Sequence, residues 1–253
     1  MQGLPFLDRL VLRIKRGDSP FAKALKRAIR FIGLPTVLRV PRVFTGLLRV
    51  AYESHYMVIR ACRTIVTIFY RGPLFQSRCA SFGRHVRMDG KMPFVEGHVQ
   101  IHIGNNVELG GNISICSGRM FDEPHLIIGD RAGIGWNTRI TVSREVVIEE
   151  DVWLPYDCSI SDTDGHPREA DRRIAMLPPD LKDVRPVRIC KKAWIGNGTH
   201  IMKGVTIGEG AIIGARSVVI SNIPPYALAM GNPAEVILKN FGLPTTKRQT
   251  LVE

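Results

Sequence analysis

The chain has 253 residues, of which 45% are hydrophobic, and its formal net charge is +12 at pH 7. This composition excludes an intrinsically disordered protein and leaves room for one large domain or two smaller ones. The opening MQGLPFLDRLVLRIKRG has no clean apolar run followed by a small-residue cleavage site, so we expect no signal peptide and a cytoplasmic protein.

The excess positive charge lies at the N-terminal end of the chain. Residues 1–80 contain 15 Lys and Arg against 3 Asp and Glu, whereas residues 81–253 contain 20 of each kind. This division predicts a basic attachment segment over residues 1–80, a neutral module over residues 81–240 and a tail over residues 241–253. Such a segment can bind an anionic membrane surface, nucleic acid or an acidic partner.

Two helices are predicted in the basic segment. In residues 20–33, apolar residues follow helical spacing and Lys and Arg fall on the opposite side. Residues 43–72 give a longer helical pattern that four charged residues interrupt. Because a transmembrane helix needs ~20 residues with few or no charges, we expect residues 1–70 to lie on an anionic membrane surface rather than to cross it. Packing onto the protein's own body is the alternative, and nucleic acid is disfavoured because aromatic residues do not interleave with the basic ones.

Cysteine usage argues against cross-linking. The five cysteines are scattered and form no Cys-x-x-Cys pair, so we expect neither a disulfide framework nor a structural zinc site. They are predicted to be small buried side chains. They are Cys62, Cys79, Cys116, Cys158 and Cys190.

An aliphatic residue recurs at every sixth position through the second half of the chain, often followed by Gly. Six is neither a strand nor a helix period, so each hexad is predicted to be a short strand and a turn, with the aliphatic side chain pointing inward. Stacking of successive coils would bury one continuous aliphatic column. The repeated positions are Ile103, Leu109 and Ile115; Ile128, Ile134 and Ile140; Ile148, Leu154 and Ile160; and Ile189, Ile195, Ile201, Ile207, Ile213 and Val219. Phe82, Met88 and Phe94 give a degenerate first coil.

The repeats resemble those of the hexapeptide-repeat acyltransferases over roughly residues 100–223. The matching stretches are IGNNVELGGNIS, IGDRAGIGWNTR and IGNGTHIMKGVTIGEGAIIGARSVV. The resemblance implies a left-handed parallel β-helix in which three hexads form one triangular coil; the handedness comes from the resemblance and not from the spacing. The predicted fold class is therefore an all-β solenoid of about five to six coils, preceded by a basic helical segment.

The hexad pattern is interrupted three times, at residues 121–126, 143–146 and 161–188, and only the third interruption is long. A loop that leaves a rigid scaffold is a usual place for chemistry. An isolated loop histidine such as His166 is more often an ordinary polar residue, so its context decides its interpretation. That context resembles the maltose, galactoside and xenobiotic acetyltransferase branch and the bacterial polysaccharide O-acetyltransferases. The elements that carry this resemblance are His166-Pro167, Trp194-Ile195-Gly196, Val205 to Gly208, Ile223-Pro224-Pro225 and Gly231 to Ala234.

The resemblance implies an acetyl-CoA-dependent enzyme that needs no metal and forms a homotrimer with its active sites between neighbouring β-helices. The reaction expected is O-acetylation of a sugar hydroxyl, with a bacterial surface polysaccharide or a lipid-linked saccharide as acceptor. The catalytic residue is predicted to be His166 as general base, because imidazole has the side-chain pKa closest to neutrality.

Further site residues are expected around this histidine. Asp162 and Asp164 would bind the second imidazole nitrogen or a sugar hydroxyl, or would cap the turn at Gly165. Trp194 would line the acceptor or pantetheine channel, or pack under the loop. Candidate contacts to coenzyme A are backbone amides near Gly196, Gly214 and Ala215, and a cationic side chain for a coenzyme phosphate from Arg216, Lys239 or Lys247-Arg248. The sequence does not determine which of these cations contacts the phosphate, because Ile220-Ser221-Asn222 replaces the Thr-Lys-Asp of many relatives.

Other functions remain open on the same fold. They are an N-acetyltransferase, an antibiotic or small-sugar acetyltransferase, and a non-enzymatic membrane- or glycan-binding β-helix. A metal-dependent hydratase similar to the gamma carbonic anhydrases is disfavoured, because its zinc needs three histidines and His200 has no neighbouring histidine in the sequence.

Overall fold

The computed structural model describes residues 20–21, 23–24, 41–118 and 120–242 of the chain. It divides into two compact units, residues 1–59 and 60–253. Of the first predicted helix, Pro20, Phe21, Lys23 and Ala24 are helical, and its remaining residues lie outside the described part of the chain.

The second predicted helix is confirmed and is longer than expected. It consists of η1 (Arg42–Phe44), α3 (Thr45–Val66), the π-helical turn η2 (Thr67–Arg71) and α4 (Gly72–Arg78). No residue of α3 is buried. Among the described residues, no helix combines the length and the apolar composition that crossing a membrane requires.

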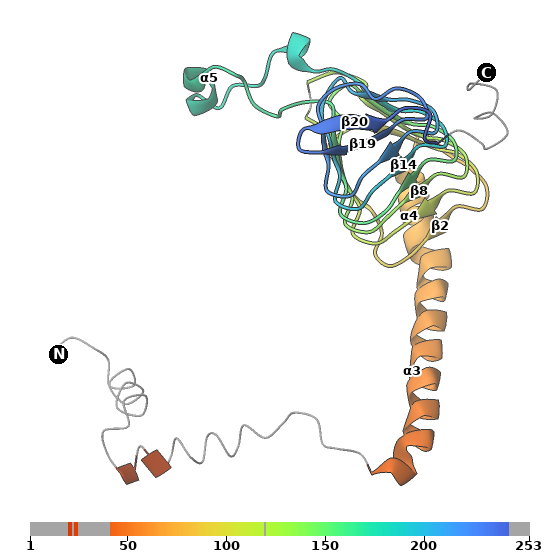
Figure 1. Cartoon of the computed structure of the whole chain (residues 1–253). Helices are drawn as coiled ribbons and strands as arrows, with labels where there is room; N and C mark the ends of the chain where they lie inside the picture. The colour runs from red at the N-terminus through yellow and green to blue at the C-terminus, as the bar shows by residue number, and fades with distance from the viewer. Residues whose placement is uncertain (1–19, 22, 25–40, 119, 243–253) are drawn as a thin grey trace. The chain divides into compact units, whose positions relative to one another are not determined.

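Three parallel sheets form the three sides of a stack of triangular coils (Figure 1). Sheet A contains β1 (Ser81–Phe82), β4 (Gln100–Ile103), β7 (His125–Ile128), β10 (Glu145–Ile148), β13 (Val187–Ile189) and β16 (Thr206–Ile207). Sheet B contains β2 (Arg87–Met88), β5 (Glu108–Leu109), β8 (Gly133–Ile134), β11 (Trp153–Leu154), β14 (Trp194–Ile195), β17 (Ile212–Ile213), β19 (Leu228–Gly231) and β20 (Ala234–Leu238). Sheet C contains β3 (Phe94–Glu96), β6 (Ser114–Cys116), β9 (Arg139–Thr141), β12 (Ser159–Ser161), β15 (His200–Ile201) and β18 (Val218–Val219). The predicted solenoid is therefore confirmed.

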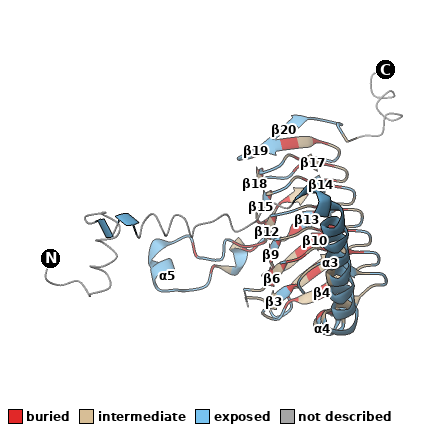
Figure 2. Ribbon diagram, turned by 90° about the horizontal axis from the view of Figure 1, so that it is seen from below, coloured by how far each residue is buried: buried red, intermediate tan, exposed pale blue. Residues whose placement is uncertain are grey.

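The hexad residues form the core, as the sequence predicts. Each exposes at most 4% of its surface, and equivalent residues pair from coil to coil, as Ile128 does with Ile148 and Ile148 with Ile189. Burying an aliphatic side chain of this size contributes about 1.5–3 kcal/mol, so the column is the main source of stability. Figure 2 shows the buried segments on successive strands along the stack.

The degenerate first coil exists, with one correction. Phe82 pairs with Ile103 and Met88 with Leu109, but it is Val95 that pairs with Ile115. Phe94 is 61% exposed. One extra residue separates the second and third strands of this coil, and strand alternation therefore turns Phe94 outward.

Both ends of the coil stack are covered. Phe75 of α4 is buried in the core and contacts Phe82 edge to face, with ring centroids 6.1 Å apart. Arg78 of the same helix donates to the backbone carbonyls of Gly97 and Val99. At the other end, β20 pairs antiparallel with β19. These caps shield the terminal coils, as a solenoid requires.

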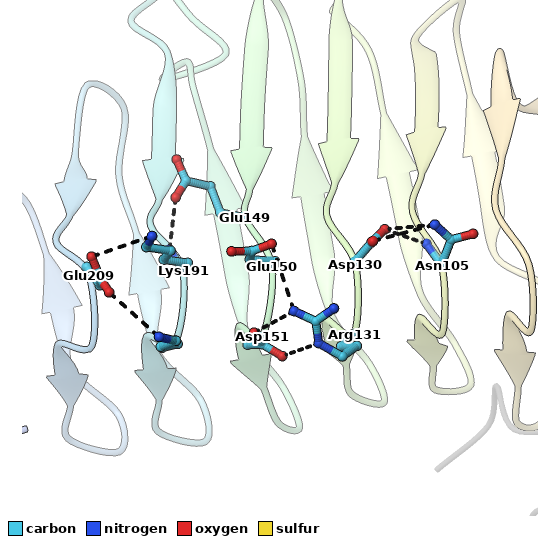
Figure 3. Close-up of polar contacts among 9 residues, drawn as sticks. Asn105, Asp130, Arg131, Glu149, Glu150, Asp151, Lys191 and Glu209 are labelled. Carbon is cyan, nitrogen blue, oxygen red and sulfur yellow. Dashed lines mark hydrogen bonds and ion pairs between the residues drawn. The ribbon is translucent and has the colours of Figure 1, made fainter. Parts of the chain in front are cut away.

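Polar side chains connect neighbouring coils along the corner between sheets A and B (Figure 3). Arg131 donates to both carboxylate oxygens of Asp151, at 2.7 and 2.8 Å, and Asn105 donates to Asp130. Such exposed pairs each contribute up to about 1 kcal/mol, so they align the coils rather than drive folding.

The cysteine prediction is only partly correct. Among the described residues there is no disulfide, but only Cys158 is buried, whereas Cys79, Cys116 and Cys190 are half-buried and Cys62 is exposed. Cys62 is exposed because it lies on α3, which buries none of its residues.

Candidate active site

All three interruptions of the repeat occur at the same corner, where the chain passes from sheet C to sheet A. They occupy residues 117–124, 142–144 and 162–186. The two short loops end earlier than predicted, because β7 and β10 already begin at His125 and Glu145 and bury Leu126 and Val146. The long loop contains α5 (Ala170–Ile174) and η3 (Leu181–Asp183) and projects from the coils (Figures 1 and 2).

Asp162 fixes the start of this long loop. Its side chain is completely buried, and its carboxylate accepts backbone N–H bonds from Ser143, Arg144 and Glu145 at 2.7, 2.6 and 2.9 Å. Burial raises the pKa of Asp162, and the three N–H donors oppose that rise. The expectation that Asp162 binds substrate or the imidazole is therefore corrected: both oxygens hold the loop of the preceding coil. The turn at Gly165 is held instead by Thr163, whose Oγ1 accepts the Gly165 N–H at 3.1 Å.

Asp164 connects the same loop to the following coil. Its Oδ2 lies 2.5 Å from Nζ of Lys203, a side chain that is only 6% exposed. The contact has the distance of an ion pair but lacks the angles of a hydrogen bond. Asp162 and Lys203 are the two charged side chains that are buried in the described part of the chain. Both lie at the corner from which the loop emerges.

His166 lies two residues beyond the Asp164–Lys203 ion pair. It is exposed, while the following Pro167 is buried. Among the described residues no side-chain hydrogen bond or ion pair to its ring is found. The loop beyond it is held internally by Arg172, whose guanidinium donates to Asp180 at 2.7 Å and holds the pKa of that carboxyl below its usual range. The imidazole of His166 is therefore exposed to solvent, on a loop whose first residues are held in place by Asp162 and by the Asp164–Lys203 ion pair.

A groove lies at a different corner, between sheets B and C. It has a volume of about 690 Å³ and is lined by Asp157, Asn197, Gly198, His200, Ala215, Arg216 and Val218. It contains two of the predicted coenzyme contacts, Ala215 and Arg216. Gly196 and Gly214 precede these turns, and an added Cβ at Gly196 would overlap the Ala215 backbone. At Gly214 an added Cβ would instead meet the side chain of Met230.

Residues 186–221 match the family described as the bacterial transferase hexapeptide, with six repeats. This match covers the coils that carry the groove and that follow the loop. Over residues 186–221 the chain is therefore similar to the bacterial hexapeptide-repeat transferases.

Curated proteins similar to this chain carry provisional acetyltransferase names. A Saccharomyces cerevisiae protein is 38% identical over 115 residues, which cover 46% of this chain and 56% of the relative. A Mycobacterium tuberculosis protein is 31% identical over 142 residues, which cover 54% of this chain and 44% of the relative. The chain thus matches about half the length of each.

A solved structure has the same fold. It is a point mutant of AntD, an N-acyltransferase from Bacillus cereus, in complex with an amino-sugar nucleotide and coenzyme A. The TM-score is 0.55 and the sequence identity 16%, with 73% of this chain and 95% of AntD covered. At this identity the likeness establishes the architecture alone.

The structure brings some predicted site residues together and separates others. Within one chain, His166 and the groove lie at different corners of the coils. Trp194 is 55% exposed on the outer face of sheet B, and Lys239 follows β20 at the C-terminal end of the stack. Lys247 and Arg248 lie outside the described residues.

Sequence reasoning missed Lys203, together with Asp157 and Asn197 of the groove. Nothing in the hexad pattern marks Lys203, because its position in the repeat is normally a solvent-facing turn. The two groove residues occupy equivalent turns of successive coils, one between β11 and β12 and the other between β14 and β15. The sequence could have predicted this equivalence, because three hexads per triangular coil place these two turns at the same corner.

Proposed function

We propose that the protein is an acetyl-CoA-dependent acetyltransferase that transfers the acetyl group to a saccharide hydroxyl, with His166 as general base. The hexapeptide-repeat match over residues 186–221 and the acetyltransferase names of the curated relatives support the reaction class. The observation that carries the proposal is the exposed His166 on a loop fixed by both buried charged side chains of the described chain.

The chemistry requires one proton transfer and one acyl transfer. The imidazole of His166 removes the proton from the acceptor hydroxyl, whose oxygen attacks the thioester carbonyl. The tetrahedral intermediate then collapses, the C–S bond breaks, and the coenzyme leaves as its thiol after protonation by the imidazolium. Negative charge on the carbonyl oxygen can be stabilised by backbone N–H groups at a coil turn, where one such donor is worth about 3 kcal/mol. The acetyl donor is proposed to lie in the groove that contains Ala215 and Arg216.

A homotrimer would unite the two halves of this site. The loop of His166 and the groove occupy different corners of each coil, so the histidine of one subunit would act at the groove of its neighbour. Light scattering coupled to size exclusion should then give three times the 28.2 kDa chain mass. A monomer that retains full activity would contradict this arrangement.

Thiol release from acetyl-CoA in the presence of an acceptor panel tests the reaction. The panel contains mono- and disaccharides, lipid-linked oligosaccharides, amino sugars and aminoglycosides. We expect release with a saccharide and a product that hydroxylamine cleaves, as an ester is cleaved. A hydroxylamine-resistant amide would replace the O-acetyl assignment by N-acetylation. If the protein neither releases thiol nor binds coenzyme A in calorimetry, a non-enzymatic β-helix is favoured.

The basic segment is proposed to attach the protein to an anionic membrane surface. In α3, Leu47, Val58 and Ile65 lie on one helical face, and all three are apolar. Arg49, Arg60 and Arg63 lie on the opposite side of the helix, and no residue of the helix is buried. Such a helix binds the interface by burying apolar area and by attracting anionic lipids.

Vesicle flotation tests the attachment. The wild-type chain should float with phosphatidylglycerol vesicles at low salt and not with phosphatidylcholine vesicles. Replacing the three arginines by Gln should lower the vesicle partition coefficient about 10²-fold, since each basic residue near the surface contributes about 1 kcal/mol and about 1.4 kcal/mol corresponds to tenfold. Equal flotation of the variant and the wild type would refute the electrostatic attachment.

A further inference from the structure

The outer face of sheet B contains a second hollow that the proposed donor groove does not use. It has a volume of about 540 Å³, within the range of small-molecule sites, and Trp136, Trp153 and Tyr156 contribute its aromatic surface. Polar side chains of the first two coils, Asp89 and the ion-paired Arg87 and Glu108, also line it. We call this the sheet B hollow.

Glycines hold both indole rings of the hollow in place. An added Cβ at Gly111 would lie 2.6, 2.8 and 3.0 Å from three adjacent atoms of the Trp136 six-membered ring, so that glycine packs against the ring face. Any side chain at Gly133 would likewise overlap the ring of Trp153. The rings therefore rest on the backbone of neighbouring coils. Their orientation is fixed before any ligand arrives, which lowers the entropy cost of binding.

The aromatic surface stays open to solvent. Trp153 is 48% exposed and Tyr156 is 53% exposed. Large aromatic side chains normally bury most of their area, so their exposure together in one hollow marks an interaction site. Carboxylates and a guanidinium beside open aromatic faces match the chemistry of a pyranose, whose C–H face stacks on an aromatic ring while its hydroxyls bond to charged groups.

The position of the hollow fits an acceptor. Tyr156 lines the hollow, and the next residue, Asp157, lines the groove proposed for the donor. Trp153 also pairs in register with Trp194 of the next coil. A saccharide in the hollow would therefore continue toward the donor groove.

We propose that the sheet B hollow is a binding subsite for pyranose rings of the saccharide acceptor. The assignment of that saccharide as acceptor rests on the proposed function, whereas saccharide binding by the hollow does not. The competing occupant is the surface of another copy of this chain.

Binding measured without acetyl-CoA tests the subsite. The probes are maltose, lactose and N,N′-diacetylchitobiose, followed by saturation-transfer NMR and by tryptophan fluorescence on the full-length protein. We expect at least one probe to bind, Trp153→Ala to weaken it at least tenfold, and Asp89→Asn to weaken it at least threefold. Phe94→Ala is the matched control, an exposed aromatic residue on sheet C, and should stay within about twofold of the wild type.

Three results would overturn the proposal: no probe binds, Trp153→Ala binds as the wild type does, or Trp153→Ala lowers the oligomer mass and so places the hollow in a subunit contact. Thiol release separates this proposal from the proposed function. If Trp153→Ala transfers acetyl groups to saccharides at the wild-type rate, only the subsite proposal is wrong. If saccharide binding depends on Trp153 but the wild type transfers no acetyl group, only the proposed enzymatic function is wrong.

Discussion

Replacing Asp162 by Ala should destabilise the β-helix, because this carboxylate is the buried acceptor for the loop of the preceding coil. Three backbone N–H groups would lose their partner: those of Ser143, a buried residue, Arg144, an exposed residue, and Glu145, a half-buried residue. The same substitution frees the start of the loop that carries His166.

The size of the effect follows from these three bonds. An unsatisfied buried donor costs about 1–3 kcal/mol, and hydrogen bonds to charged groups contribute about 1.5–3 kcal/mol each. Burial of the carboxylate, which raises its pKa, offsets part of this gain. We therefore expect a net loss of about 2–4 kcal/mol in the free energy of unfolding. For a domain of this size that loss lowers Tm by about 5–15 °C.

Differential scanning calorimetry measures the effect, with Asp122→Ala as matched control. Asp122 is an exposed carboxylate in the loop 117–124 at the same corner, and its removal should change stability by less than about 0.5 kcal/mol. Asp162→Asn keeps the side-chain volume but turns an NH₂ group toward backbone donors, so it should also destabilise. A Tm within 2 °C of the wild type, measured for Asp162→Ala at neutral pH, would show that these three hydrogen bonds do not stabilise the fold.

Three further predictions concern the loop, the thiols and the coil spacing. Lys203→Met keeps the packed volume but removes the charge facing Asp164, so kcat should fall about tenfold with the acetyl-CoA KM unchanged. Adding Asp164→Asn to this variant should cause no further loss of kcat. A change confined to KM would contradict this positioning role. Burial raises the pKa of the Cys79 thiol to about 11, so little thiolate exists near neutrality. Iodoacetamide at pH 8, followed by peptide mass spectrometry, should therefore label the exposed Cys62 before Cys79, with the Cys79 rate increasing with pH toward that value; equal rates would oppose the burial of Cys79. Gly196→Ala should cost about 1–3 kcal/mol in chemical denaturation, because its Cβ would overlap the next coil, and an unchanged midpoint would show that the coils can separate freely.

The sequence predicts the coil architecture well, because the hexad period records a burial that every coil repeats. The hexad residues from Ile103 to Val219 keep their register. The three interruptions fall at one corner because three hexads, which form one complete coil, separate each interruption from the next. The degenerate first coil is less predictable, since one additional residue before Val95 reverses which side of the strand Phe94 occupies.

The polar residues around the loop could not be assigned from the sequence. The partners of Asp162 lie in residues 143–145, and the partner of Asp164 is Lys203, so both contacts join different coils. The chain between Asp164 and Lys203 includes the long loop, whose path no periodicity describes, and the partners of Asp162 lie in and beside the short loop 142–144. Neighbouring Asp162 and Asp164 thus look equivalent in sequence but perform different tasks, one buried against backbone and one paired with a lysine.

His166 is proposed to be the general base of acetyl transfer. The most direct measurement compares kcat of the wild type, His166→Ala and His98→Ala with one saccharide acceptor at neutral pH. His98 is an exposed histidine of the β-helix, distant in sequence from the loop, and serves as the matched control. We expect kcat to fall by about 10²- to 10⁴-fold for His166→Ala and by less than about twofold for His98→Ala. A fall of less than about tenfold for a folded His166→Ala enzyme would contradict it.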